Sequence, residues 1–133
     1  MGIEWSDELS MFNPDIDAEH KRLIELVNEM NREIASQKRS QDEIIRIISL
    51  MLGHSAEHFA HEERLFSEHN YPDAAEHTEI HIELIGKLNL ALKEIQNTDH
   101  VRRWVDAGLS VQDLLVDHLV KEDTKYIQCL RTE

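Results

Sequence analysis

Hydrophobic residues recur along the chain with the period of an α-helix in four separate segments. Between Ile16 and Ile34 the inward positions are separated alternately by four and three residues, which places them on one helical face. A similar alternation runs through residues 44–69, through residues 77–95 and along the segment after residue 101. The pattern predicts helices over residues 16–37, 41–69, 73–96 and 101–130.

Residues that cap or break helices separate these segments. Ser40 followed by Glu43 is the pattern of a capping box, which starts a helix. The second segment stops at Asn70-Tyr71-Pro72, where Pro72 is a natural helix breaker, and the Asn-Thr-Asp sequence at 97–99 ends the third. Asp17 is interpreted as an N-terminal cap of the first helix. The connections between the helices are therefore expected to be short.

Long helices with short connections predict an all-α fold, an up-down-up-down four-helix bundle. We expect one domain over residues 1–133, with residues 1–15 as an irregular N-terminal leader. The composition agrees with this prediction. Only 4 Gly and 2 Pro are present, which is little turn material for a fold of many strands.

The charge balance narrows the classes of partner. A formal net charge of −13 argues against nucleic acid and against anionic membrane surfaces, both of which require basic residues. No apolar run approaches the roughly 18 residues of a membrane span, and the N-terminus lacks the pattern of a secretory signal. Cys129 is the only cysteine, so no internal disulfide or multi-cysteine metal site is expected. We expect a monomeric, cytoplasmic protein that does not insert into membranes.

Polar residues interrupt the apolar faces of all four predicted helices. A buried polar group without a partner costs on the order of 1–3 kcal/mol. For one isolated histidine, a hydrogen bond within the core is the commoner explanation, but so many inward polar side chains indicate a shared partner. They are His20, His58, Glu62, His77, His81 and His118.

Their spacing predicts a metal site in the centre of the bundle. His58 and Glu62 are four residues apart, as are His77 and His81, so each pair can converge on one ion. Zinc takes four ligands, fewer than this set offers. Imidazole and carboxylate without thiolate suit iron, manganese, copper or zinc. Two six-coordinate ions bridged by carboxylates would use all of the donors.

The fourth helix offers two candidates for a further carboxylate ligand. Glu122 follows His118 by four residues, which helical geometry favours. Asp123 follows it by five and lies about 140° around the helix, so it would need a locally widened turn to reach the centre. Spacing alone leaves both residues open.

Short motifs distributed over nearly the whole chain carry a family resemblance. They are Ile16-Asp17-Ala18-Glu19-His20-Lys21, His58-Phe59-Ala60-His61-Glu62-Glu63, Tyr71-Pro72 followed by His77 and His81, and His118 followed by Asp123 and Tyr126, with Trp5 ahead of them. In this order and spacing they resemble the hemerythrin family, specifically its single-domain bacterial branch, the bacteriohemerythrins.

The resemblance implies a particular set of ligands. It implies two iron ions per chain, joined by Glu62, by Asp123 rather than Glu122, and by one oxo or hydroxo bridge. One iron would be held by His77, His81 and His118. The other would be held by His20 and His58. These donors fill all but one position of two octahedral ions and leave the vacancy on the iron of His20 and His58, where O2 would bind.

The function implied is reversible O2 binding, for oxygen storage or for delivery to an oxygen-consuming enzyme. Terminal imidazole ligands favour carrying O2 over activating it, since ferritin-like di-iron proteins use mostly carboxylates. We therefore expect no enzymatic turnover. The alternatives are an O2 or redox sensor that acts through a partner, and a di-iron enzyme that removes peroxide or nitric oxide. Simple storage of iron or zinc is a third.

A dry O2 pocket is expected over the open position, although each lining residue is also an ordinary core residue. By resemblance it is lined by Leu23, Phe59, Leu114, Leu115 and Leu119. Leu114 stands where the family often has Trp, a change that would enlarge or loosen the pocket. Of the remaining histidines, His54 is expected to be partly exposed or to bond a ligand, and His69 to lie at a helix end. His61 and His100 are expected at the surface.

Overall fold

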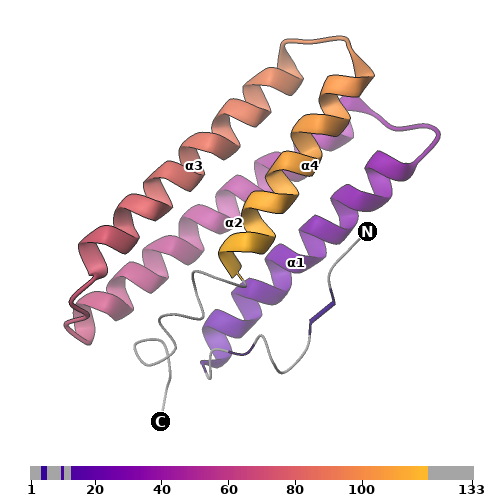
Figure 1. Ribbon diagram of the computed structural model, residues 1–133. Helices are drawn as coiled ribbons and strands as arrows, with labels where there is room; N and C mark the ends of the chain where they lie inside the picture. Colours follow the sequence, from indigo (N-terminus) through magenta and orange to yellow (C-terminus); the bar gives the residue numbers. More distant parts are fainter. Residues whose placement is uncertain (1–3, 6–9, 11–12, 120–133) are drawn as a thin grey trace.

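The computed structural model describes residues 4–5, 10 and 13–119 of the chain. It contains the helices α1 (Pro14–Ala35), α2 (Gln41–Glu68), α3 (Ala74–Gln96) and α4 (Val101–Asp117). The described residues form no strand. The prediction of an all-α four-helix bundle is confirmed (Figure 1).

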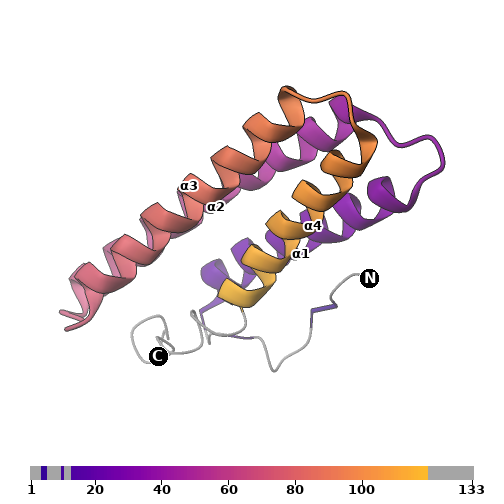
Figure 2. The same cartoon turned by 45° about the horizontal axis from the view of Figure 1, so that its top comes forward.

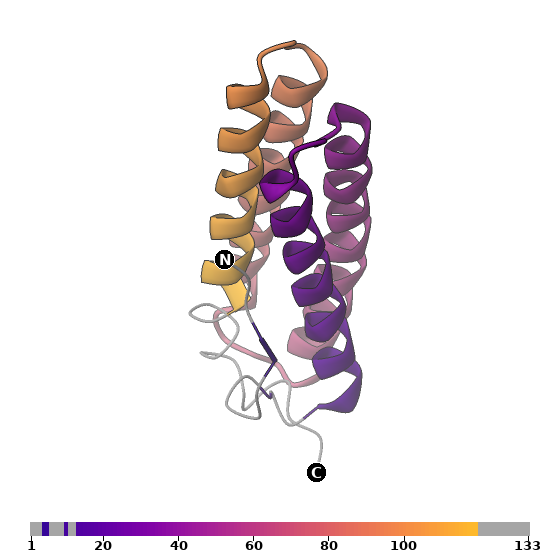
Figure 3. The ribbon, with the colours of Figure 1, turned by 90° about the vertical axis from the view of Figure 1, so that its right-hand side faces the viewer.

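The helices run in alternating directions around a shared interior. Figure 1 shows the order along the chain, and the two turned views in Figures 2 and 3 show the four helices side by side. Each helix contacts the next one in sequence, and α4 also contacts α1, which closes the bundle. Gly108 lies at this α4–α1 contact, where an added Cβ atom would lie 2.8 Å from Cδ1 of Ile34 and would require that side chain to move.

The first helix begins two residues earlier than predicted, and its cap is a different residue. The side chain of Asn13 accepts hydrogen bonds from the backbone N–H groups of Asp15 and Ile16, both at 3.1 Å. Pro14 occupies the first helical turn, where its missing N–H costs nothing. The interpretation of Asp17 as the cap is wrong: Asp17 lies inside the helix and accepts a hydrogen bond from Ser10 at 2.6 Å.

At the start of the second helix, only one of the two hydrogen bonds of the predicted capping box forms. The Ser40 hydroxyl accepts from the backbone N–H of Glu43 at 3.3 Å, as expected. The reciprocal bond is replaced, because the Ser40 N–H donates to Glu33 on α1 at 2.8 Å. The carboxylate of Glu43 instead accepts from Arg46. This arrangement ties the start of α2 to the end of α1.

The second helix ends at Glu68, one residue before the predicted end and just ahead of the Asn70-Tyr71-Pro72 stretch that was expected to stop it. Asn70 adopts a left-handed conformation with φ 51°, and the Tyr71 N–H donates to the Phe66 carbonyl at 2.9 Å. A single residue in the left-handed conformation is a common way for an α-helix to end, and here the chain turns away from the helix before it reaches the proline. The turn places the Tyr71 ring 5.4 Å from the Phe66 ring, between centroids.

The fourth helix begins at Val101 as predicted, and its backbone widens at His118 and Leu119 into a π-helical turn. The predicted continuation over residues 120–130 lies outside the described residues. Within the described part of the chain, no helix is both long and apolar enough to span a membrane.

The interior is divided into apolar parts with polar side chains between them. A large cluster fills the half of the bundle nearest the α1–α2 connection and includes Met30, Ile48 and Leu88, all fully buried. A smaller cluster of Ile16 and Phe66 closes the end nearest the α2–α3 turn. The polar residues at the inward positions lie between these two clusters.

Asn13 should contribute measurably to stability through its two cap bonds. Asn13→Ala should lower the free energy of unfolding of the metal-free protein by about 1 kcal/mol, measured by urea denaturation. Asp73 is the matched control, because it occupies the same position before α3 without a side-chain cap bond. An equal loss in Asp73→Ala would contradict the assignment of the effect to capping.

Candidate metal centre

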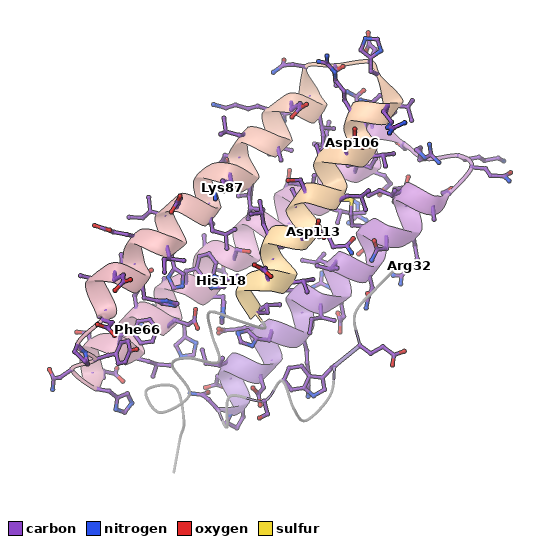
Figure 4. All side chains as sticks on the ribbon, viewed as in Figure 1. Arg32, Phe66, Lys87, Asp106, Asp113 and His118 are labelled. Carbon is purple, nitrogen blue, oxygen red and sulfur yellow. The ribbon has the colours of Figure 1, made fainter. Side chains whose placement is uncertain are left out.

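All six inward polar residues predicted from the sequence lie in the interior, at the end of the bundle nearest the α2–α3 turn. Their exposed fractions lie between 0% and 4%. Every helix contributes: α1 through His20, α2 through His58 and Glu62, α3 through two histidines, and α4 through His118 at its end. Figure 4 shows Phe66 and His118 in this half of the bundle.

The described residues form two groups of possible metal ligands that share Glu62. One group contains four donors, from Glu62, His77, His81 and His118. The other contains three donors, from His20, His58 and Glu62. Within each group the donor atoms all lie within 4.8 Å of one another. Glu62 is thus the side chain at which the two groups meet.

The distances between donor atoms suit metal coordination. The Nε2 atoms of His20 and His58 are 3.0 Å apart. Two nitrogens bound at right angles to one ion, each at about 2.1 Å, are separated by about 3 Å. Oε1 of Glu62 lies 3.3 Å from Nε2 of His58 and 3.3 Å from Nε2 of His81. A single carboxylate therefore stands between the two groups, as a bridging ligand must.

Two further carboxylates contact Nδ1, the second ring nitrogen, of His58 and His81. Nδ1 of His58 lies 2.7 Å from Glu19, and Nδ1 of His81 lies 3.3 Å from Glu63. When Nδ1–H donates to a carboxylate, the Nε2 atom keeps its lone pair for a metal. The geometry thus favours the ligating tautomer of both rings.

Glu19 is a residue that sequence reasoning missed. Its second oxygen lies 2.8 Å from Nδ1 of His61, which is half-buried by this contact and not simply a surface residue as expected. Burial alone would raise the pKa of Glu19, but hydrogen bonds with His58 and His61 outweigh it and lower the pKa below its usual value. The only sequence signal was its place beside His20, one helical position from the inward face.

Aromatic rings enclose the four-donor group. The Phe59 ring stacks on the His81 ring with centroids 3.9 Å apart, and lies 5.1 Å from the His118 ring. The Phe66 and His77 rings form a T-shaped contact with centroids 4.8 Å apart. These contacts fix the orientations of the imidazoles and keep water from them.

The five residues predicted to line an O2 pocket occupy three different surroundings. Leu23 and Leu119 lie in a small cluster with Ile24, against which Trp5 packs. Phe59 and Leu115 belong to the large apolar cluster. Leu114 is half-buried and lines an open groove of about 780 Å³ between α3 and α4.

The open groove has an apolar lining with mostly acidic charged residues, and it reaches the site at one point. Figure 4 shows Lys87 on α3 and Asp106 and Asp113 on α4 along it. His118 also contributes to its lining. Leu114 therefore faces a different space from Leu23 and Leu119, which the sequence pattern did not distinguish.

The remaining candidate residues are placed as follows. His54 is half-buried, whereas His69 and His100 are exposed at helix ends, as expected. Asp123 and Glu122 lie outside the described residues. The π-helical turn that begins at His118 is the kind of widened turn that Asp123 would require, since its backbone bonds join residues five apart.

The chemistry of the donors supports iron binding. Imidazole nitrogens and carboxylate oxygens without thiolate suit iron among the transition metals. The donors come from all four helices and converge without rearrangement of the backbone. The site is therefore a preformed centre for a cation.

Comparisons with known proteins agree with this geometry. Residues 11–130 match the family model described as the hemerythrin HHE cation binding domain. A bacteriohemerythrin of Pseudomonas aeruginosa is 27% identical over 129 residues, covering 97% of this chain and 82% of that protein. Those of Methylococcus capsulatus and Campylobacter jejuni are 29% and 28% identical, covering 86% and 90% of this chain and 85% and 89% of the respective relatives. The chain belongs to the hemerythrin family of cation-binding domains.

Proposed function

We propose that this chain binds O2 reversibly at a pair of iron ions, to store oxygen or to deliver it to an oxygen-consuming enzyme. The observation that carries the proposal is the position of Glu62, whose Oε1 atom is equidistant from a histidine of each donor group. An oxygen atom shared in this way suits two neighbouring ions better than one. When bound, such a pair supplies the electrons for reversible O2 binding.

The kinds of ligand favour a carrier over an enzyme. Five of the six described donors are imidazoles, which bring no negative charge. Di-iron proteins of the ferritin-like class use mostly carboxylates, which stabilise more oxidised iron. Asp123 is the carboxylate that we propose as the second bridge, on the strength of the family motif. With so few anionic ligands, the site favours release of O2 over its consumption.

The surrounding residues of the chain orient the ligands and exclude water. Glu19 and Glu63 hold Nδ1 of His58 and His81, which directs their Nε2 atoms inward. Phe59 and Phe66 cover the imidazoles of the four-donor group. Exclusion of water matters for a carrier, because water and protons promote loss of the bound gas and oxidation of the iron.

The decisive experiment combines metal analysis with absorption spectroscopy. Protein loaded anaerobically with Fe(II) should retain two iron ions per chain. Its spectrum, recorded under argon, then air, then argon again, should gain a visible charge-transfer band that disappears in the last step. A band that persists would show that the reaction with O2 is not reversible and would contradict the carrier, and lasting turnover of peroxide or nitric oxide would indicate an enzyme. Retention of a single zinc ion would end the proposal.

Removal of one terminal imidazole should weaken the site. His77→Ala should increase the rate of iron loss to a chelator by about 10-fold or more, because a fully buried donor of the four-donor group disappears. His100→Ala is the matched control, since His100 is exposed at the start of α4. Equal iron retention in the two variants would remove His77 from the ligand set.

Glu19 should affect the retention of iron through its contact with His58. Glu19→Ala should accelerate iron loss by between about 10- and 100-fold, since the ring of His58 loses the carboxylate that fixes its tautomer. Glu19→Gln should restore part of the retention, because the amide oxygen can still accept from Nδ1–H. The exposed Glu25 on the same helix provides the control, as Glu25→Ala. No change in Glu19→Ala would show that the contact is incidental.

A further inference from the structure

Ser55 is a polar residue in an otherwise apolar part of the core. It lies within α2, on the same buried face as His58 and Glu62, and is 0% exposed. Its hydroxyl has no hydrogen-bond partner, neither a backbone carbonyl nor a side chain of the described part of the chain. An unpartnered buried hydroxyl is unfavourable, so its presence here requires an explanation.

The register of the bundle places Ser55 directly next to the metal centre. α1 and α3 run one way and α2 and α4 the other (Figure 1). The layer of side chains next to the histidines, on the side of the large apolar cluster, therefore holds the residues three positions after His20 and His81 and three positions before His58 and His118. Its members are Leu23, Ser55, Leu84 and Leu115, all of them buried.

Within this layer Ser55 differs from the leucines in size as well as polarity. A serine side chain fills much less volume than leucine. The leucines offer no hydrogen-bonding group. A small molecule in this layer would therefore find one donor, the Ser55 hydroxyl, in apolar surroundings, which is the usual composition of a specific small-ligand site.

The two donor groups differ in their cover and in their number of donors. The four-donor group is covered by Phe59, which stacks on His81 and approaches His118. The group of His20 and His58 has only three donors among the described residues, so an ion there is the one with room for a further ligand. Ser55 precedes His58 by one helical turn and lies on the same face of α2.

We propose that the Ser55 hydroxyl donates a hydrogen bond to a small acceptor ligand, such as a monoanion or a diatomic gas, that binds on the His20–His58 side of the centre. This inference rests on the proposed function and adds a specificity residue to it. Ser55 makes the pocket selective for ligands that accept hydrogen bonds. It does so without contributing a ligand to the metal.

Azide is a suitable probe, as a small anion that binds ferric iron and accepts hydrogen bonds. Titrations of the iron-loaded, oxidised protein should give a dissociation constant roughly 10-fold higher for Ser55→Ala than for the unsubstituted chain, as expected for a lost hydrogen bond to a charged acceptor. Ser49→Ala should leave the constant unchanged, because Ser49 is exposed on the same helix. Equal azide affinity in Ser55→Ala and Ser49→Ala would overturn the proposal.

A second measurement uses the metal-free protein. Ser55→Ala removes a hydroxyl that lacks a partner there, so its urea unfolding midpoint should be equal to or higher than that of Ser49→Ala. A markedly lower midpoint would show that the hydroxyl is already bonded within the protein, and would overturn the proposal. If the unsubstituted protein retains no iron, the proposed function fails. If it retains iron and binds azide with an affinity that Ser55→Ala does not alter, only the role of Ser55 fails.

Discussion

The structure depends on the burial of a carboxylate among imidazoles at the point where all four helices meet. An ionised carboxylate in the interior costs several kcal/mol unless opposite charge or hydrogen bonds compensate it. Glu62 is fully buried, and one of its oxygens stands between His58 and His81. A bound cation turns this unfavourable arrangement into a favourable one. The same side chains that would weaken a simple bundle thus link its four helices through a shared ion.

The helix pattern and the inward polar residues could be predicted from the sequence because both follow from periodicity. The ends of the helices were less predictable. The side chain of Asn13 caps α1, and Asn70 adopts the left-handed turn just after α2; both are local contacts that a periodic pattern does not specify. Glu33 takes the place of Glu43 at Ser40 for a similar reason: a contact between helices outweighs a local motif.

The contacts around the ligands were beyond sequence reasoning. Glu19 bonds both His58 and His61 from the neighbouring helix, and this depends on how α1 is rotated against α2. Leu114 and Leu115 are adjacent in sequence, yet one lines an open groove and the other lies in the core. Ser55 has the spacing of a core residue, and only its lack of a hydrogen-bond partner in the described structure singles it out.

The separation of the large apolar cluster from the metal centre has a consequence for assembly. The half of the bundle around Ile48 and Leu88 is held together by hydrophobic packing and by hydrogen bonds such as that from the Ser40 N–H to Glu33, and none of these contacts involves a candidate metal ligand. That half can therefore act as a scaffold during biosynthesis, presenting the histidines in register before any iron arrives. Binding of a cation then becomes a capture step into an existing framework.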